Sequence, residues 1–527
     1  MTTRLRILVG VLCSALFMSC HRQDVPASAV QPEGYAEVLE MYRNGQKYTE
    51  ASVNGEMLRL KAGGDEIVMS LAGMVVDEGF VANPQVVSIG DDGFWYVGGK
   101  PAGVRRNPEL PDEEAVPFYL FFTTDKSLHI RVSSGLHIVI EKQLRTIPSV
   151  YLTTSDGGEI TSKEEYKEGT IVIEDPDGMY WNTPKFEASM KIRGRGNSTW
   201  GMPKKPYKIK LDSKARIFDM STDKEWCLLA NYTDKSLIRN IVAMEISRRL
   251  GFSWTPRMLP VEVYLNGAYQ GVYCFSEHKK VSSERVNISI EAGDMLFELE
   301  QNLDEPVCWT TEHGAPVMFS DPDEPSQEQI SYAKSFFKGF EDALWAKDFT
   351  SVYEKYIDVP SFINNFIIQE FTKNVDGNLR KSTFLTLPKD GKLEMYHVWD
   401  FDLILGNCDY YNDGLPTWQG WWIKDQGAWG RGHGWYYRLF MDPDFTAQVK
   451  RRWIEMYPQL ETIPEYVARQ VDLLGDAPDR NFARWQILDR YVWPNGKVTG
   501  SYEGEVDWLL ENYSKRLKWL DAQIRSW

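Results

Sequence analysis

The feature that most constrains the fold is a glycine-rich stretch between two segments in which apolar and polar residues alternate. Residues 188–193 and 207–211 show this alternation, which is typical of half-buried β-strands. Between them, residues 194–201 read Gly-Arg-Gly-Asn-Ser-Thr-Trp-Gly. Glycine has no side chain to clash, so the backbone can turn tightly and approach a ligand closely. The pattern therefore predicts two strands joined by a loop with accessible backbone amides.

A helix and a second pair of strands follow. Residues 236–250 carry apolar side chains at helical spacing and stop at Gly251, a residue suited to a C-terminal cap. Residues 260–265 and 271–276 are strand-like, and Asn266-Gly267 between them is a strong hairpin signal. The order of two strands, a helix and two strands is close to that of the amino-terminal lobe of a protein kinase, although many α+β domains share it.

The second half of the chain is predominantly helical by pattern. Amphipathic or closing helices are predicted over residues 330–345, 360–375, 445–474 and 506–527. We therefore expect an α+β domain over residues 146–527. Its N-lobe would span about 146–300 and its helical C-lobe about 325–527.

Residues 34–145 differ from this domain, because short apolar runs alternate there with turn signals such as Gly63-Gly64. This spacing predicts a small all-β, sandwich-like module. Within it, residues 92–100 resemble a segment common in N-terminal modules of Bacteroidetes lipoproteins. We expect a spacer or a binding module.

The first residues have the layout of a secretory signal. Arg4 and Arg6 precede a short apolar run over residues 7–18, and Ser19-Cys20 follows. A cysteine after a small residue at this place resembles the lipobox of bacterial lipoproteins. We expect a signal peptide over residues 1–19, lipidation of Cys20, a tether over residues 20–33, and an exported lipoprotein anchored in a membrane, in particular the outer membrane. The alternative is an ordinary cleaved signal with an incidental cysteine.

Charge and cysteine content exclude two classes of function. The 527-residue chain has a net charge of −16, whereas a nucleic-acid-binding protein needs a basic face against the phosphate backbone. No C-x-x-C pair occurs among the cysteines, so the sequence predicts neither a zinc site nor a redox motif.

The glycine-rich loop and the strand after it carry possible phosphate ligands. Arg195 and Ser198 could donate hydrogen bonds from the loop. Lys208 and Lys210 are two residues apart and therefore share one face of their strand. A lysine that points into a cleft is the usual positive charge for nucleotide phosphates. The alternative is a tight hairpin beside a solvated basic face.

Two acidic motifs lie about two dozen residues apart, each at the end of a predicted element. Asp376 follows a helix, and Asp400 and Asp402 follow a strand. Phosphoryl transfer needs one carboxylate beside the acceptor hydroxyl and another that holds magnesium on the phosphates. The alternative is a turn at Asp376 and structural salt bridges at the other two.

Taken together, the motifs resemble the CotH family, atypical protein kinases named after a spore-coat protein. The similar blocks are residues 195–200, 205–208, 229–234, 264–267, 270–273 and 399–402. The resemblance covers roughly residues 148–440. It implies a two-lobed, kinase-like fold that binds ATP and Mg²⁺ and phosphorylates serines of a protein substrate.

The resemblance also assigns roles to residues. It places Arg195 and Ser198 in the phosphate loop and gives Lys208 or Lys210 the part of the nucleotide lysine. The remaining roles that it implies are a helix partner for that lysine at Glu245, an adenine-binding hinge at Glu277, a catalytic aspartate at Asp376, and magnesium ligands at Asp400 and, less directly, Asn378.

The chain departs from ordinary kinases in three ways, one of which is that the glycine-rich loop lacks the third glycine at kinase spacing. Asp402 stands where a glycine follows the Asp-Phe pair, and Lys381 stands five residues after Asp376, where kinases carry a metal-binding asparagine. ATP is also scarce outside the cytosol. The alternative is therefore an inactive kinase-like binding or adhesion lipoprotein, with a carbohydrate platform formed by residues 418–422, Trp429 and Trp435.

Overall fold

A computed structural model describes most of the carboxyl-terminal part of the chain. It covers residues 147–527 apart from 176–177, 179, 182, 184, 378, 411–413 and 426–433, and before residue 147 it covers nine strands and residues 34, 37, 38 and 48. The signal, the tether and Cys20 lie outside the described residues. Strands and helices both contribute extensively, so the predicted α+β class is confirmed. Among the described residues, no helix has the length and apolar character that crossing a membrane requires.

The chain divides into two compact units, Met1–Arg145 and Thr146–Trp527. In the first unit, nine strands form three antiparallel sheets of three strands each. The sheets are β1 (Glu50–Asn54), β2 (Met57–Ala62) and β3 (Asp65–Ser70); β4 (Val87–Ile89), β5 (Phe94–Val97) and β6 (Lys100–Arg105); and β7 (Phe118–Thr123), β8 (Ser127–Val132) and β9 (His137–Glu141). A sandwich-like packing of these sheets stays a prediction.

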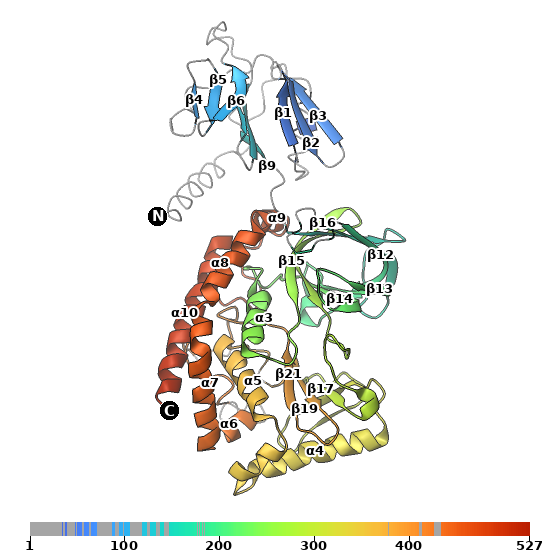
Figure 1. The fold of residues 1–527 in the computed structure, drawn as a ribbon, viewed down its shortest axis with the longest axis vertical. Helices are drawn as coiled ribbons and strands as arrows, with labels where there is room; N and C mark the ends of the chain where they lie inside the picture. Colours follow the sequence, from blue (N-terminus) through green and yellow to red (C-terminus); the bar gives the residue numbers. More distant parts are fainter. Residues whose placement is uncertain are drawn as a thin grey trace. The chain divides into compact units, whose positions relative to one another are not determined.

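The second unit begins with a closed barrel of seven strands (Figure 1). Its strands, in barrel order, are β10 (Ser149–Thr154), β11 (Lys167–Glu174), β12 (Lys185–Gly194), β13 (Tyr207–Arg216), β14 (Thr222–Leu229), β16 (Ala268–Glu277) and β15 (Met258–Leu265). The parallel pairing of β10 with β15 closes the ring. Closure pairs every strand on both sides and leaves no open edge. The glycine-rich stretch joins β12 to β13, as the sequence predicts.

The predicted hairpin and helix are both present. Asn266 and Gly267 adopt φ angles of 49° and 79° between β15 and β16, which is the left-handed geometry of a tight hairpin turn. The helix α3 (Arg239–Leu250) lies between β14 and β15 and ends at Gly251. The barrel has three strands that the kinase-like element order did not include, namely β10, β11 and β14.

A second sheet follows the barrel. Its order is β18 (Cys308–Thr310), β19 (Pro316–Asp321), β17 (Met295–Leu299), β20 (Thr383–Leu387) and β21 (Glu394–Val398). The sequence analysis did not predict β17 to β19. The β20–β21 hairpin leads directly into the acidic motif at residues 399–402.

Seven helices are described from residue 327 onward. They are α4 (Gln327–Trp345), α5 (Val359–Thr372), α6 (Trp435–Leu439), α7 (Pro443–Glu461), α8 (Ile463–Leu474), α9 (Ala477–Arg484) and α10 (Tyr502–Arg525). The single helix predicted over residues 445–474 is therefore wrong, because α7 and α8 are separate. Pro464, in the first turn of α8, cannot donate the backbone hydrogen bond that a continuous helix needs there.

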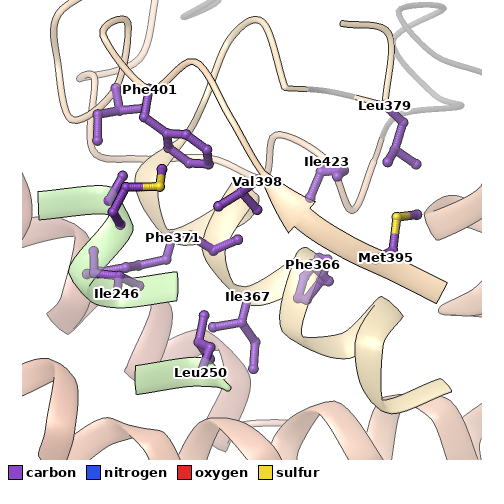
Figure 2. Packing of buried hydrophobic residues seen from close by; sticks show 14 of the residues in the cluster. Ile246, Leu250, Phe366, Ile367, Phe371, Leu379, Met395, Val398, Phe401 and Ile423 are labelled. Atoms are coloured by element: carbon purple, nitrogen blue, oxygen red, sulfur yellow. The ribbon is translucent and has the colours of Figure 1, made fainter. Parts of the chain in front are cut away.

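An apolar core joins α3, α5 and β21. Figure 2 shows Ile246 and Leu250 of α3 facing Ile367 and Phe371 of α5, with Val398 and Phe401 above them, and these side chains are almost fully buried. Val398 and Phe401 flank Trp399 and Asp400 in the sequence. Their burial fixes the backbone that carries the acidic motif, because packed interiors resist displacement.

Candidate functional site

A cavity of about 190 Å³ collects four of the residues predicted for catalysis, nucleotide binding or metal binding. Its walls come from the glycine-rich loop, the segment after β14, the region of β16 and β17, and the segments after α5 and β21. The four predicted residues that line it are Arg195, Ser198, Asp376 and Asp400. Segments separated by about two hundred positions in the sequence therefore meet at one site.

The glycine-rich loop owes its shape to Gly196. This residue has a φ angle of 85°, and a Cβ atom there would lie 2.2 Å from Thr199 Oγ1. Any other residue would be strained and would displace the short 3-10 turn at Ser198–Gly201. The Arg195 amide donates to the carbonyl of Pro206 at 3.2 Å, which closes the loop at its base. The Arg195 guanidinium lies over the Trp399 ring at 5.7 Å.

Two hydrogen bonds and an unusual backbone angle define the acidic motif after β21. Asp400 has a φ angle of 68°, which is uncommon for a residue with a side chain and typical of functional turns. The next amide, that of Phe401, donates to Asn240 Oδ1 of α3 at 2.8 Å. Thr233 Oγ1 donates to Asp402 Oδ2 at 2.9 Å. The barrel side and the helical side of the unit therefore both position these carboxylates.

Negative charge is in excess at the floor of the cavity. Burial raises the pKa of Asp400, and the charge of Asp376 raises it further, against the opposing charges of Arg195 and Lys381. Burial, followed by the charges of Asp400 and Asp376, raises the pKa of Asp402 to about 8. Because ionisation of these carboxylates is costly, either a proton or a bound cation stabilises them.

Asp376 is connected to the Asp400 segment through Asn374. The Asn374 side-chain amide donates to the Asp400 carbonyl at 3.3 Å, and Asn374 Oδ1 accepts from the Asp376 amide at 3.3 Å. Asp376 Oδ1 also lies 3.5 Å from Lys381 Nζ. The two acidic motifs that the sequence analysis paired are thus held together by one side chain between them.

The described residues contain no group of three or more His, Cys, Asp or Glu side chains that could hold a metal ion by themselves. Mg²⁺ in phosphate sites is usually bound by only one or two carboxylates, together with substrate phosphates and water. The raised pKa values of Asp400 and Asp402 fit a divalent cation that arrives with a nucleotide. Asn378 lies outside the described residues, so its role stays a prediction.

The two lysines predicted for the nucleotide do not line the cavity. The alternation was correct, since Tyr207, Ile209 and Leu211 are buried in the barrel. Lys208 and Lys210 lie on the outer face of β13 instead. There Lys208 Nζ is 2.8 Å and Lys210 Nζ is 3.9 Å from the carboxylate of Glu225.

The two predicted glutamates also have other partners. Glu245 forms ion pairs at 2.7 Å with Arg248 and Arg249 of its own helix, so the expected pairing with Lys208 or Lys210 is wrong. Glu277 is buried in the barrel, where its carboxylate accepts hydrogen bonds from the amides of Ser221 and Arg257. Because backbone amides hold both of its oxygens and it does not line the cavity, the structure does not bring it to an adenine hinge.

The cavity contains a lysine–glutamate pair that the sequence analysis missed. Lys279, two residues after the end of β16, forms an ion pair with Glu298 of β17, and both side chains line the cavity. The position of Lys279 directly after the hairpin was a usable signal. Its pairing could not be found, because it depends on the strand β17 that was not predicted.

The tryptophans proposed as a carbohydrate platform are largely internal. Trp422 and Trp435 are buried, and Trp422 Nε1 donates to the Asn374 carbonyl at 2.7 Å. Trp421 packs against Trp519 and Trp527, with ring centroids 5.3 Å apart in each case. Trp429 lies outside the described residues. The described tryptophans therefore support the helical core and the acidic motif, and the predicted platform is wrong for Trp422 and Trp435.

Comparison with known proteins gives a family match whose range contains the residues of the cavity. Residues 192–520 match the family model described as CotH kinase protein. This range includes the glycine-rich loop, both acidic motifs and most of the helical region. No curated protein matches the chain.

Proposed function

The chain belongs to the CotH kinase protein family, and we propose that it is an ATP- and magnesium-dependent phosphotransferase that acts on serine hydroxyls of a protein. The observation that carries this proposal is the meeting of Arg195 and Ser198 with Asp376 and Asp400 in one cavity. Phosphoryl transfer needs donors for the phosphates, a metal-binding carboxylate and a carboxylate beside the acceptor. The cavity offers each of these.

In the proposed mechanism each residue has one task. The Arg195 guanidinium, the Ser198 hydroxyl and the Lys279 ammonium donate to phosphate oxygens. Asp400, with Asp402 beside it, holds the metal, which when bound neutralises charge on the phosphates. Asp376 would accept the proton of the serine hydroxyl as that oxygen bonds to the terminal phosphorus of ATP, while the bond from this phosphorus to the bridging oxygen breaks and ADP leaves.

The position of Asp376 suits a role between two substrates. Besides lining the cavity, it borders a second, open hollow of about 300 Å³. This hollow is also lined by Arg380 and by Tyr410 and Trp493, whose rings stack with centroids 6.1 Å apart. A polypeptide lying in the hollow would bring a hydroxyl next to Asp376, which borders both spaces. We propose this hollow as the route of the protein substrate.

The test is calorimetry of the full-length chain with ATP, with and without Mg²⁺, together with transfer of labelled phosphate to a serine-containing protein. We expect nucleotide binding that depends on Mg²⁺, followed by transfer. Binding without transfer to the chain itself or to any serine substrate would support the inactive binding scaffold. Absence of both would overturn the proposed function.

We also propose that the protein acts at the cell envelope as a lipoprotein anchored through Cys20. The sequence of a positive start, a short apolar run and Ser19-Cys20 supports this proposal. Metabolic labelling with a fatty acid should mark the wild type and leave Cys20→Ala unlabelled, because acyl chains supply the membrane affinity. Equal labelling of both proteins would exclude anchoring through Cys20.

A further inference from the structure

Lys381 occupies a position with a defined task in protein kinases. In those enzymes the residue five positions after the catalytic aspartate is an asparagine that binds a second magnesium ion. Here Lys381 stands five positions after Asp376, and its ammonium lines the same cavity as Asp400. We propose that the Lys381 ammonium replaces a second metal ion, so that the site works with one Mg²⁺ per nucleotide. This inference rests on the proposed function.

The contacts of Lys381 place its charge where a second cation would otherwise act. Its Nζ lies 3.5 Å from Asp376 Oδ1. Lys381 lines the same cavity as Asp376, Asp400 and Glu300. One ammonium therefore shares this cavity with these three carboxylates.

The backbone of Lys381 is held in place by the second sheet. The Lys381 carbonyl accepts from Thr383 Oγ1 at 3.1 Å, at the start of β20. The preceding carbonyl, of Arg380, accepts from the Gln301 amide at 2.7 Å. The side chain thus extends from an anchored segment, and 32% of it is exposed to solvent. The anchored backbone and the 3.5 Å contact with Asp376 Oδ1 keep the ammonium beside the cavity.

Electrostatics explains why a lysine would exclude the second ion. A fixed ammonium within a few ångströms of Asp376 repels a divalent cation in the same space and satisfies part of the negative charge that would attract it. Lysine also has three donors and no acceptor, so it cannot ligate a metal while it is protonated. If Lys381 only formed a structural salt bridge, its replacement would not be expected to change the number of bound metal ions.

The experiment counts metal ions rather than turnover. The full-length chain in detergent is saturated with a non-hydrolysable ATP analogue and titrated with Mn²⁺, and bound Mn²⁺ is counted by electron paramagnetic resonance. The wild type should bind one Mn²⁺ with the nucleotide, and Lys381→Asn should bind two. Lys381→Arg keeps the charge and should bind one. Lys392→Asn, an exposed lysine outside the cavity, is the matched control and should also bind one.

The outcomes separate this inference from the proposed function. Two Mn²⁺ ions per nucleotide in the wild type would overturn the role of Lys381 and leave the phosphotransferase intact. One ion in both wild type and Lys381→Asn would show that Lys381 does not set the number, and would also overturn it. No nucleotide-dependent Mn²⁺ in the wild type would overturn the proposed function itself. A wild-type count of two would overturn the inference even if Lys381→Asn failed to fold.

Discussion

Two regions of the carboxyl-terminal unit bring lysines and carboxylates together, and they differ in which charge is in excess. The first is the outer-face cluster of the barrel, formed by Glu225 with Lys208, Lys210 and Lys280, each of which has its ammonium within 4 Å of the Glu225 carboxylate. The second is the cavity, where three aspartates, Asp376, Asp400 and Asp402, line one space with a few cations. One region has several lysines around one carboxylate, and the other has clustered carboxylates.

The pKa values record this difference. Burial alone would raise the pKa of Glu225, but the hydrogen bond and charge of Lys208 and the charge of Lys280 outweigh it and lower the pKa. In the cavity, burial and neighbouring carboxylates act in the same direction and raise the pKa of Asp402 to about 8. A compensated cluster is a structural feature, whereas an uncompensated one is suited to bind a cation from solution.

The largest effect is expected for Asp400→Asn. The variant removes the charge that the metal needs, so the affinity for nucleotide in the presence of Mg²⁺ should fall. The fall should exceed the roughly 10–100-fold loss of metal affinity that is typical when a residue supporting a metal ligand is replaced. Calorimetry with ATP and Mg²⁺ measures this loss, and phosphate transfer should vanish with it.

Asp390→Asn is the matched control for that variant, because it makes the same change at an exposed turn between β20 and β21. It should leave binding unchanged. Unaltered metal-dependent binding in Asp400→Asn would mean that the excess charge of the cavity serves no metal, and the contrast between the two regions would lose its functional meaning.

Asp376→Asn should fail at a different step. If Asp376 accepts the proton of the acceptor hydroxyl, ATP affinity should stay close to that of the wild type, while transfer falls on the order of a hundredfold or more. Single-turnover transfer of labelled phosphate, together with calorimetry, separates the two quantities. Transfer at the wild-type rate would show that another group is the base.

The local features of the fold were predictable because they depend on neighbouring residues. The strand alternation at residues 207–211, the Asn266-Gly267 turn and the stop of α3 at Gly251 all follow from short-range geometry. Barrel closure could not be predicted, since it depends on the parallel pairing of β10 with β15, more than a hundred residues apart.

The site was predictable in part, for a related reason. Arg195, Ser198, Asp376 and Asp400 belong to motifs whose spacing carries chemical meaning, and they meet in the cavity. Lys208 was misplaced because alternation shows that residues share a face without showing which face borders a ligand. Lys279 and Glu298 were missed because their contact is made only after β16 and β17 are brought together in the fold.

The smallest effect is expected at the outer-face cluster, where Glu225→Gln should change stability and leave nucleotide binding unaltered. The folded pKa of Glu225 is lowered from its usual 4.5, so its charge stabilises the fold above that pH, and this contribution is lost as pH falls through the folded pKa. The difference in melting temperature between wild type and variant should therefore be largest near pH 7 and shrink toward pH 3. We expect about 1 kcal/mol at pH 7, because the pair lies near the surface. Thermal melts across this range measure it. If Glu225→Gln instead abolished nucleotide binding at an unchanged melting temperature, Lys208 would belong to the site after all, and charge compensation would no longer distinguish the two regions.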